Sequence, residues 1–149
     1  MSLFFECLTP RSVRWKELTI QIANVSWRAG ASLAEKMKNE TFSHGETVIV
    51  GTNDEGEMAC FCRVSQEDGL IETSFGPFIG YVFVKENYRG RGLSAVLLKE
   101  AESFLKGQQV PAVYIVSGEV GLYEKSGYEK IKDCETIHGH IESLFWKKL

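Results

Sequence analysis

The sequence predicts an α+β fold in which helices flank a mixed sheet of about seven strands. Two observations support this prediction. Residues 78–84 and 112–116 are almost continuously apolar, as strands are when both faces of their sheet are covered. Between them, residues 93–106 place apolar side chains on one side of a helix that Gly107 ends. Because strand-like segments precede and follow this unit, we expect one continuous sheet.

The N-terminal region is predicted to form a strand and two helices. Residues 3–8 alternate weakly, as a strand does, and Thr9 with Pro10 provides the start signals of a helix. The apolar face of this helix comprises Trp15, Leu18, Ile22 and Val25. Ala29 and Gly30 are expected to interrupt the helical pattern. The second helix then has an apolar face comprising Leu33, Ala34 and Met37.

A hairpin follows the helices. Residues 47–50 and 58–64 are its predicted strands, and residues 53–56 form its turn. The last predicted elements are a short helix at residues 120–125, which stops at Gly127, and strands at residues 128–131 and 141–147.

Size, charge and targeting signals limit the classes of function. The 149 residues fit a single domain spanning residues 1–149. The net charge of -3 and the pI near 5.7 argue against a nucleic-acid partner. The sequence contains neither a secretory leader nor an apolar run long enough to cross a bilayer, so we expect a cytoplasmic protein without a membrane partner.

The cysteine and histidine pattern allows a metal site but does not favour one. Cys60 and Cys62 would point to one face of a strand, and His138 with His140 would complete a set of four ligands. This spacing fits neither a zinc finger nor a zinc ribbon. We therefore predict no metal, and reduced cysteines.

The most informative segment is residues 88–94, Tyr-Arg-Gly-Arg-Gly-Leu-Ser, between a predicted strand and the longest helix. It offers no acidic or asparagine cap, so the first backbone N–H groups of the helix remain available. Gly90 and Gly92 allow close approach to the backbone, while Arg89 and Arg91 add positive charge. Together these features indicate a phosphate site, with a tight turn and solvated arginines as the alternative. The loop matches neither the P-loop nor the dinucleotide motif.

This segment resembles the signature [QR]-x-x-G-x-[GA] of the GCN5-related N-acetyltransferase (GNAT) family. Arg89, Gly92 and Ser94 occupy its three defined positions, with serine in place of the usual glycine or alanine. Residues 84–90 are similar to the family's V-x-P-x-Y-R-G run, with glutamate in place of proline. Residues 122–128 are similar to its F/L-Y-E-K-x-G-F segment. The resemblance extends over roughly the last two-thirds of the chain.

The resemblance implies a mostly antiparallel sheet with one splayed strand pair, and acetyl-CoA as the acyl donor. Its diphosphate would bind the loop residues Arg89, Gly90, Arg91, Gly92, Leu93 and Ser94. The backbone of Phe83 and Val84 would hold the pantetheine arm and the thioester carbonyl, where a preorganised N–H stabilises an oxyanion by about 3 kcal/mol. Tyr123 stands where the family places a tyrosine, and we predict that it protonates the leaving thiolate.

The sequence leaves the general base and the acceptor open. Glu72 is the best carboxylate candidate for the base, followed by His138 and His140, with ordered water as the alternative. An acceptor pocket could be lined by Trp27, Phe42 and Tyr81, with Glu35 attracting a cation. The leading hypothesis is acetyl transfer to a primary amine of a small molecule or peptide. The alternatives are a non-catalytic acyl-CoA sensor on the same fold and an unrelated nucleotide-binding regulator. A homodimer is compatible with each of these functions.

Overall fold

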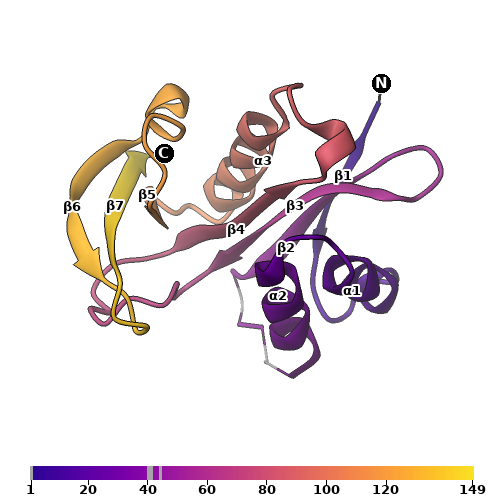
Figure 1. The fold of residues 1–149 in the computed structure, drawn as a ribbon, viewed down its shortest axis with the longest axis horizontal. Coiled ribbons are helices and arrows are strands. Elements are labelled where there is room, and N and C mark those ends of the chain that lie inside the picture. The colour runs from indigo at the N-terminus through magenta and orange to yellow at the C-terminus, as the bar shows by residue number, and fades with distance from the viewer. Residues whose placement is uncertain (1, 40–41, 44) are drawn as a thin grey trace.

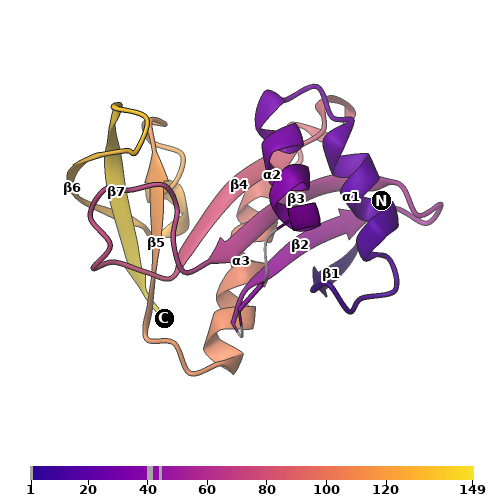
Figure 2. The ribbon, with the colours of Figure 1, turned by 90° about the horizontal axis from the view of Figure 1, so that it is seen from below.

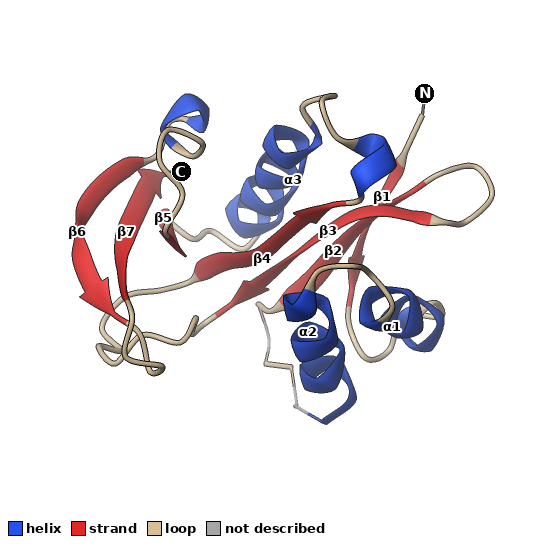
Figure 3. Ribbon diagram, in the orientation of Figure 1, coloured by secondary structure: helices blue, strands red, loops and turns tan. Residues whose placement is uncertain are grey.

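The computed structural model describes residues 2–39, 42–43 and 45–149 of the chain. Within them lies one seven-stranded sheet with the order β1-β2-β3-β4-β5-β7-β6 (Figure 3). Its strands are β1 (Phe4–Leu8), β2 (Thr47–Thr52), β3 (Met58–Ser65), β4 (Phe78–Val84), β5 (Ala112–Ser117), β6 (Glu129–Glu135) and β7 (Ile141–Lys148). The pair β4 and β5 is parallel and the other neighbours are antiparallel. The predicted α+β fold class is therefore confirmed.

Helices cover both faces of the half of the sheet formed by β1 to β4 (Figure 1). The α-helices are α1 (Trp15–Ala23), α2 (Arg28–Asn39) and α3 (Leu93–Gly107). Val48 and Val50 pack against α1 and α2, whereas Ile49 between them faces α3. This alternation produces two apolar layers, one on each side of the sheet. Within the described residues, no helix has both the length and the apolar character that a membrane span requires.

Both predictions about the first helices need correction. α1 begins at Trp15 rather than at Thr9-Pro10, because the Thr9 N–H donates to Ser12 Oγ at 2.9 Å and closes a separate turn. Ala29-Gly30 lies inside α2 rather than between the helices. A Cβ on Gly30 would lie 2.7 Å from the Ile22 carbonyl oxygen, so this glycine serves the close approach of α1 and α2.

The C-terminal elements also differ from prediction in extent. The short helix expected at residues 120–125 is a 3₁₀ turn, η2 (Glu124–Ser126), and Gly127 follows it with a φ of 90°. A further 3₁₀ turn, η1 (Glu86–Tyr88), follows β4. β6 continues to Glu135 because β7 pairs with it to that residue.

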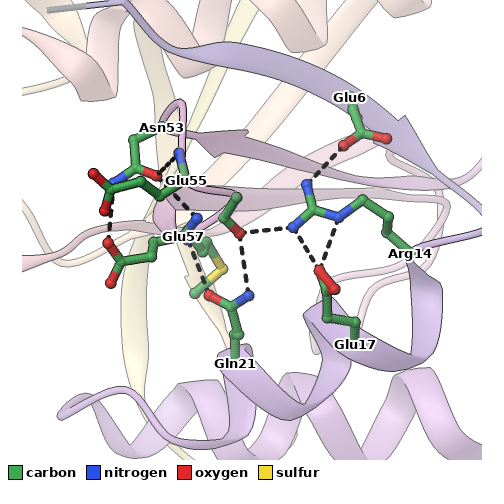
Figure 4. Close-up of polar contacts among 9 residues, drawn as sticks. Glu6, Arg14, Glu17, Gln21, Asn53, Glu55 and Glu57 are labelled. Atoms are coloured by element: carbon green, nitrogen blue, oxygen red, sulfur yellow. Dashed lines mark hydrogen bonds and ion pairs between the residues drawn. The ribbon is translucent and has the colours of Figure 1, made fainter.

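Polar contacts anchor α1 to the β2–β3 hairpin (Figure 4). Arg14 Nη2 donates to the Gly56 carbonyl oxygen at 2.7 Å, and the Met58 N–H donates to Gln21 Oε1 at 2.9 Å. In the predicted turn, Asn53 Oδ1 accepts the N–H of Glu55 at 2.9 Å. These contacts hold both ends of α1 against the hairpin, and thereby position the connection to α2 that borders the site described below.

A buried polar network joins α3 to the last two strands. Glu102 of α3 is 6% exposed and accepts hydrogen bonds from Tyr128 Oη at 2.7 Å and from Lys147 Nζ at 3.0 Å. Tyr128, which is 2% exposed, is therefore a core residue.

We expect Lys147→Met to lower the free energy of unfolding by about 3 kcal/mol, because it leaves the Glu102 carboxylate buried without its cation. Urea denaturation measures this change, and Lys148→Met, at an exposed position, is the matched control. Equal losses in the two variants would contradict the role of the buried ion pair.

Candidate active site

The parallel strands β4 and β5 diverge soon after they meet (Figure 2). Among the described residues they pair at one position, Phe78 with Tyr114, where the Tyr114 N–H donates to the Pro77 carbonyl at 2.9 Å. Beyond this point one edge of β4 has no neighbouring strand. The splayed pair that the family resemblance implied is thus present.

A bulge in β4 lies beside the opening. Phe83 is opposite Phe61 and Gly80 is opposite Arg63, so that two residues of β4 face the single residue between them on β3. The first of the two, Tyr81, has a φ of 52°, a left-handed conformation that few side chains adopt. Such bulges bend a strand and interrupt its ladder of hydrogen bonds.

The direction of each amide along β4 follows from its pairing with β3. The Lys85 N–H donates to the Ala59 carbonyl at 2.9 Å, and alternate residues of an antiparallel strand bond to the same neighbour. The Phe83 N–H is therefore directed to β3, whereas that of Val84 is directed to the opening. Of the two amides predicted to bind the cofactor, that of Val84 thus faces the opening and that of Phe83 does not. Val82, which the sequence did not indicate, lines the first and second of the cavities described below.

The loop before α3 has the features of an anion site. Gly92 is the N-cap of α3, with a φ of 72° and no side-chain cap, and Gly90 has a φ of 79°. A Cβ on either glycine would meet no atom within 4 Å, so the space in front of the loop is open. The Val96 N–H donates to the Gly92 carbonyl, which leaves the amides of Leu93 and Ser94 ahead of the helical ladder. These features fit a phosphate group.

Arg89 connects this loop to the free edge of β4. Its Nε donates to the Val84 carbonyl at 2.9 Å, and its guanidinium lies 5.6 Å from the centre of the Phe83 ring. A second interaction, at 3.7 Å, joins Arg89 to Glu86, which accepts the Ser26 hydroxyl at 3.0 Å. The predicted phosphate-binding arginine is thus oriented toward the strand that would hold the pantetheine arm.

Three cavities follow one another along the opening. The first, of about 490 Å³, begins at Arg89 and Ser94 and runs along β4. The second, of about 450 Å³, shares with it Trp27, Val82, Glu119 and Tyr123. The third, of about 410 Å³, shares with the second Asp68, Tyr81, His138 and Glu142. A ligand entering at the loop and one entering from the far side would therefore meet beside Tyr123.

Tyr123 has the properties of a proton donor at this meeting point. Its side chain is 7% exposed, and burial, assisted by the nearby carboxylate of Glu119, raises the pKa of Tyr123 to about 12. The hydroxyl is therefore protonated at neutral pH and can give its proton to a thiolate, whose pKa is near ~8.5.

Comparison with known proteins agrees with this geometry. The family model described as Acetyltransferase (GNAT) family matches residues 13–128, which is most of the chain. The chain belongs to the GNAT acetyltransferase family. A search of curated proteins finds no match.

Solved structures share this GNAT fold over nearly the whole chain. The GNAT N-acetyltransferase YhbS from Escherichia coli, in complex with CoA, is 19% identical with a TM-score of 0.71, covering 98% of this chain and 81% of that one. An aminoglycoside 6'-N-acetyltransferase complexed with coenzyme A is 14% identical with a TM-score of 0.69, covering 97% and 96%. A GNAT acetyltransferase from Staphylococcus aureus is 16% identical with a TM-score of 0.66, covering 99% of each chain. At these identities the likeness establishes the fold.

Glu72, the predicted base, is not brought together with Tyr123. Its carboxylate accepts hydrogen bonds from Lys132 at 2.9 Å and from Ser74 at 2.9 Å on the exposed side of the β3–β4 connection. The bond from Lys132 holds the pKa of Glu72 below its usual range, which makes it a weaker base. Glu72 lines neither of the cavities that contain Tyr123. Of the predicted alternatives, His138 lines the second cavity and His140 the third.

The predicted acceptor pocket is present in part. Trp27 and Tyr81 line the second cavity, and the Trp27 ring stacks on that of Phe83 at 5.4 Å. Phe42 lines none of the three cavities and instead packs edge-on against Trp15, with ring centres 5.0 Å apart. The exposed Glu35 accepts a hydrogen bond from Asn39, its neighbour on α2, at 2.8 Å.

Asp68 is the functional candidate that the sequence analysis missed. It lines the second and third cavities, and a Cβ on Gly80 would lie 2.7 Å from its Oδ2. The carboxylate thus lies directly against the bulged part of β4. The glycine inside an otherwise apolar strand was the available signal, since such glycines often mark a close approach.

Proposed function

We propose that the chain transfers an acetyl group from acetyl-CoA to a primary amine of a small molecule or peptide. One observation carries this proposal: the free edge of β4 leads from an open, uncapped helix N-terminus to a buried and protonated Tyr123. The helix N-terminus can bind a diphosphate, the free strand edge can bind an extended arm that contains amides, and the tyrosine can protonate a leaving thiolate.

Each part of the site has a role in this reaction. The loop amides and Arg89 bind the diphosphate, and the gap-facing amide of Val84 pairs with the pantetheine arm. Val82 lines both cavities that contain Tyr123, and we assign to its amide the stabilisation of charge on the thioester oxygen. Tyr123 then protonates the sulfur as the carbon–sulfur bond breaks.

The acetyl group passes directly to the amine, without a covalent enzyme intermediate. Cys60 and Cys62 are fully buried on the α3 face of β3, as their spacing predicted. Burial raises the pKa of Cys60 to about 12 and that of Cys62 further, so neither is a thiolate at neutral pH. Among the described residues, no cluster of histidine, cysteine and carboxylate side chains could hold a metal ion.

Calorimetry with acetyl-CoA and with free CoA tests the proposed donor. We expect binding of both, and about tenfold weaker binding by Arg89→Ala, because a charge-assisted hydrogen bond to a phosphate contributes at least ~1.5 kcal/mol. Arg11→Ala, in the turn before α1, is the matched control. Absence of heat with the wild-type protein would reject the site, and unchanged affinity in Arg89→Ala would reject the diphosphate assignment.

A non-catalytic acyl-CoA sensor remains the second candidate function. It would need the phosphate loop but no proton donor, so the position of Tyr123 between two cavities favours the enzyme. Incubation with acetyl-CoA and a panel of primary amines separates the two functions. Release of free thiol that depends on the amine supports the enzyme, whereas tight binding without release supports the sensor.

A further inference from the structure

Asp68 lies on the acceptor side of the proposed reaction centre. It belongs to the β3–β4 connection, is partly buried, and approaches β4 at Gly80, just before the bulge at Tyr81. The cavity that it lines also contains Tyr123, whereas the cavity leading to the phosphate loop does not include Asp68. An amine entering opposite the acyl donor would therefore pass this carboxylate.

The charges of the second cavity suit an ammonium group. Its lining carries the carboxylates of Asp68, Glu119 and Glu142, and of its described residues none is a lysine or an arginine. Of the three carboxylates, Glu119 is exposed, and the partly buried Glu142 is the second residue of β7. In the described part of the chain, no hydrogen bond or ion pair to the Asp68 carboxylate is found. This side chain therefore has acceptor capacity left for a ligand.

The surroundings of Asp68 make it a stronger base than an ordinary carboxylate. Burial raises the pKa of Asp68 to about 6, with Arg63 of β3 opposing and Glu142 of β7 assisting the shift. The second and third cavities, which Asp68 lines, contain further titratable or charged groups: Lys36 of α2, Tyr81 of β4, Glu119 and Tyr123 after β5, and Glu67, His138 and His140 in the connections. Asp68 is ionised at neutral pH and can accept a proton there.

We propose that Asp68 is the general base that removes a proton from the acceptor ammonium, an inference that rests on the acetyltransferase function proposed above. Asp68 takes one proton from the ammonium nitrogen, which then bonds to the thioester carbon. The carbon–sulfur bond breaks and Tyr123 gives its proton to the thiolate. The nitrogen then loses a second proton, which reaches Tyr123 through solvent and restores its hydroxyl. One proton thus leaves on the thiol, and Asp68 releases the other to solvent beside the exposed His138.

The test compares Asp68→Asn with the wild-type protein, using the amine of the panel that reacts fastest. We expect kcat to fall about 100-fold, which is the usual contribution of a general base. In the wild-type protein kcat/KM should rise with pH through about 6 as Asp68 ionises, and this limb should be absent from Asp68→Asn. The affinity for acetyl-CoA should stay unchanged, because Asp68 lies outside the first cavity.

Two further variants make the result decisive. Asp54→Asn, in the β2–β3 turn, is the matched control and should keep wild-type kinetics. Glu72→Gln tests the rival carboxylate. If Glu72→Gln removes the acid limb, or if Asp68→Asn retains both the limb and its turnover, Asp68 is not the base. If the wild-type protein binds no acetyl-CoA or acetylates no amine, the proposed function fails first, and the two failures are thereby distinguished.

Discussion

Replacing Tyr123 with phenylalanine is expected to lower turnover about 100- to 1,000-fold, with a much smaller change in KM. The variant keeps the ring that packs at 5.8 Å from Phe145 and removes the hydroxyl between the two cavities. Without this proton donor the sulfur must leave as a free thiolate. Steady-state kinetics with acetyl-CoA and a reactive amine measure the change.

Tyr128→Phe provides the matched control for this experiment. Both tyrosines are buried in the same apolar cluster, with ring centres 6.4 Å apart, but the Tyr128 hydroxyl donates to Glu102 and lines neither cavity. Tyr128→Phe should therefore lose stability and keep its turnover. Similar turnover losses in the two variants would assign the effect to packing and remove Tyr123 from the chemistry.

The pH dependence gives a second check on Tyr123. A donor is active while protonated, and burial raises the pKa of Tyr123 to about 12. Tyr123 should thus impose no decline of kcat up to about pH 10, whereas a tyrosine with an ordinary pKa near ~10 would already be half ionised there.

The sequence was informative where function depends on local backbone chemistry. The loop from Tyr88 to Ser94 could be interpreted directly, because an uncapped helix start with Gly90 and Gly92 in left-handed conformations is a property of neighbouring residues. Tyr123 could be proposed as a candidate because a short motif surrounds it. In both cases the residues that interact are close in sequence.

Features that depend on distant segments were not accessible in this way. Which amides of β4 face the opening depends on the bulge opposite Cys62. A shift of the pairing by one residue would direct the N–H of Phe83, instead of that of Val84, to the opening. The choice of Asp68 over Glu72 as the proposed base depended on the path of the β3–β4 connection. Glu72 and Asp68 are only a few residues apart, but the first is directed to Lys132 on β6 and the second to Gly80 on β4.

The stability of Asp68→Asn should show that this carboxylate is retained at a thermodynamic cost. The pKa of Asp68 is raised from 3.8 to about 6 in the folded chain, so folding favours its protonated form. The resulting stability is complete below pH 3.8 and is lost as the pH rises through about 6. Each pKa unit corresponds to ~1.4 kcal/mol, so the ionised carboxylate costs about 3 kcal/mol at pH 8.

Asparagine has the same shape and no charge, so Asp68→Asn should be more stable than the wild-type protein by about 3 kcal/mol at pH 8 and by only about 1 kcal/mol at pH 4.5. Urea denaturation at the two pH values measures both differences. Equal destabilisation at both would instead make Asp68 a structural hydrogen-bond acceptor. A variant that gains stability while it loses turnover is expected where a side chain is kept for chemistry, because a charge placed for catalysis need not be placed well for folding.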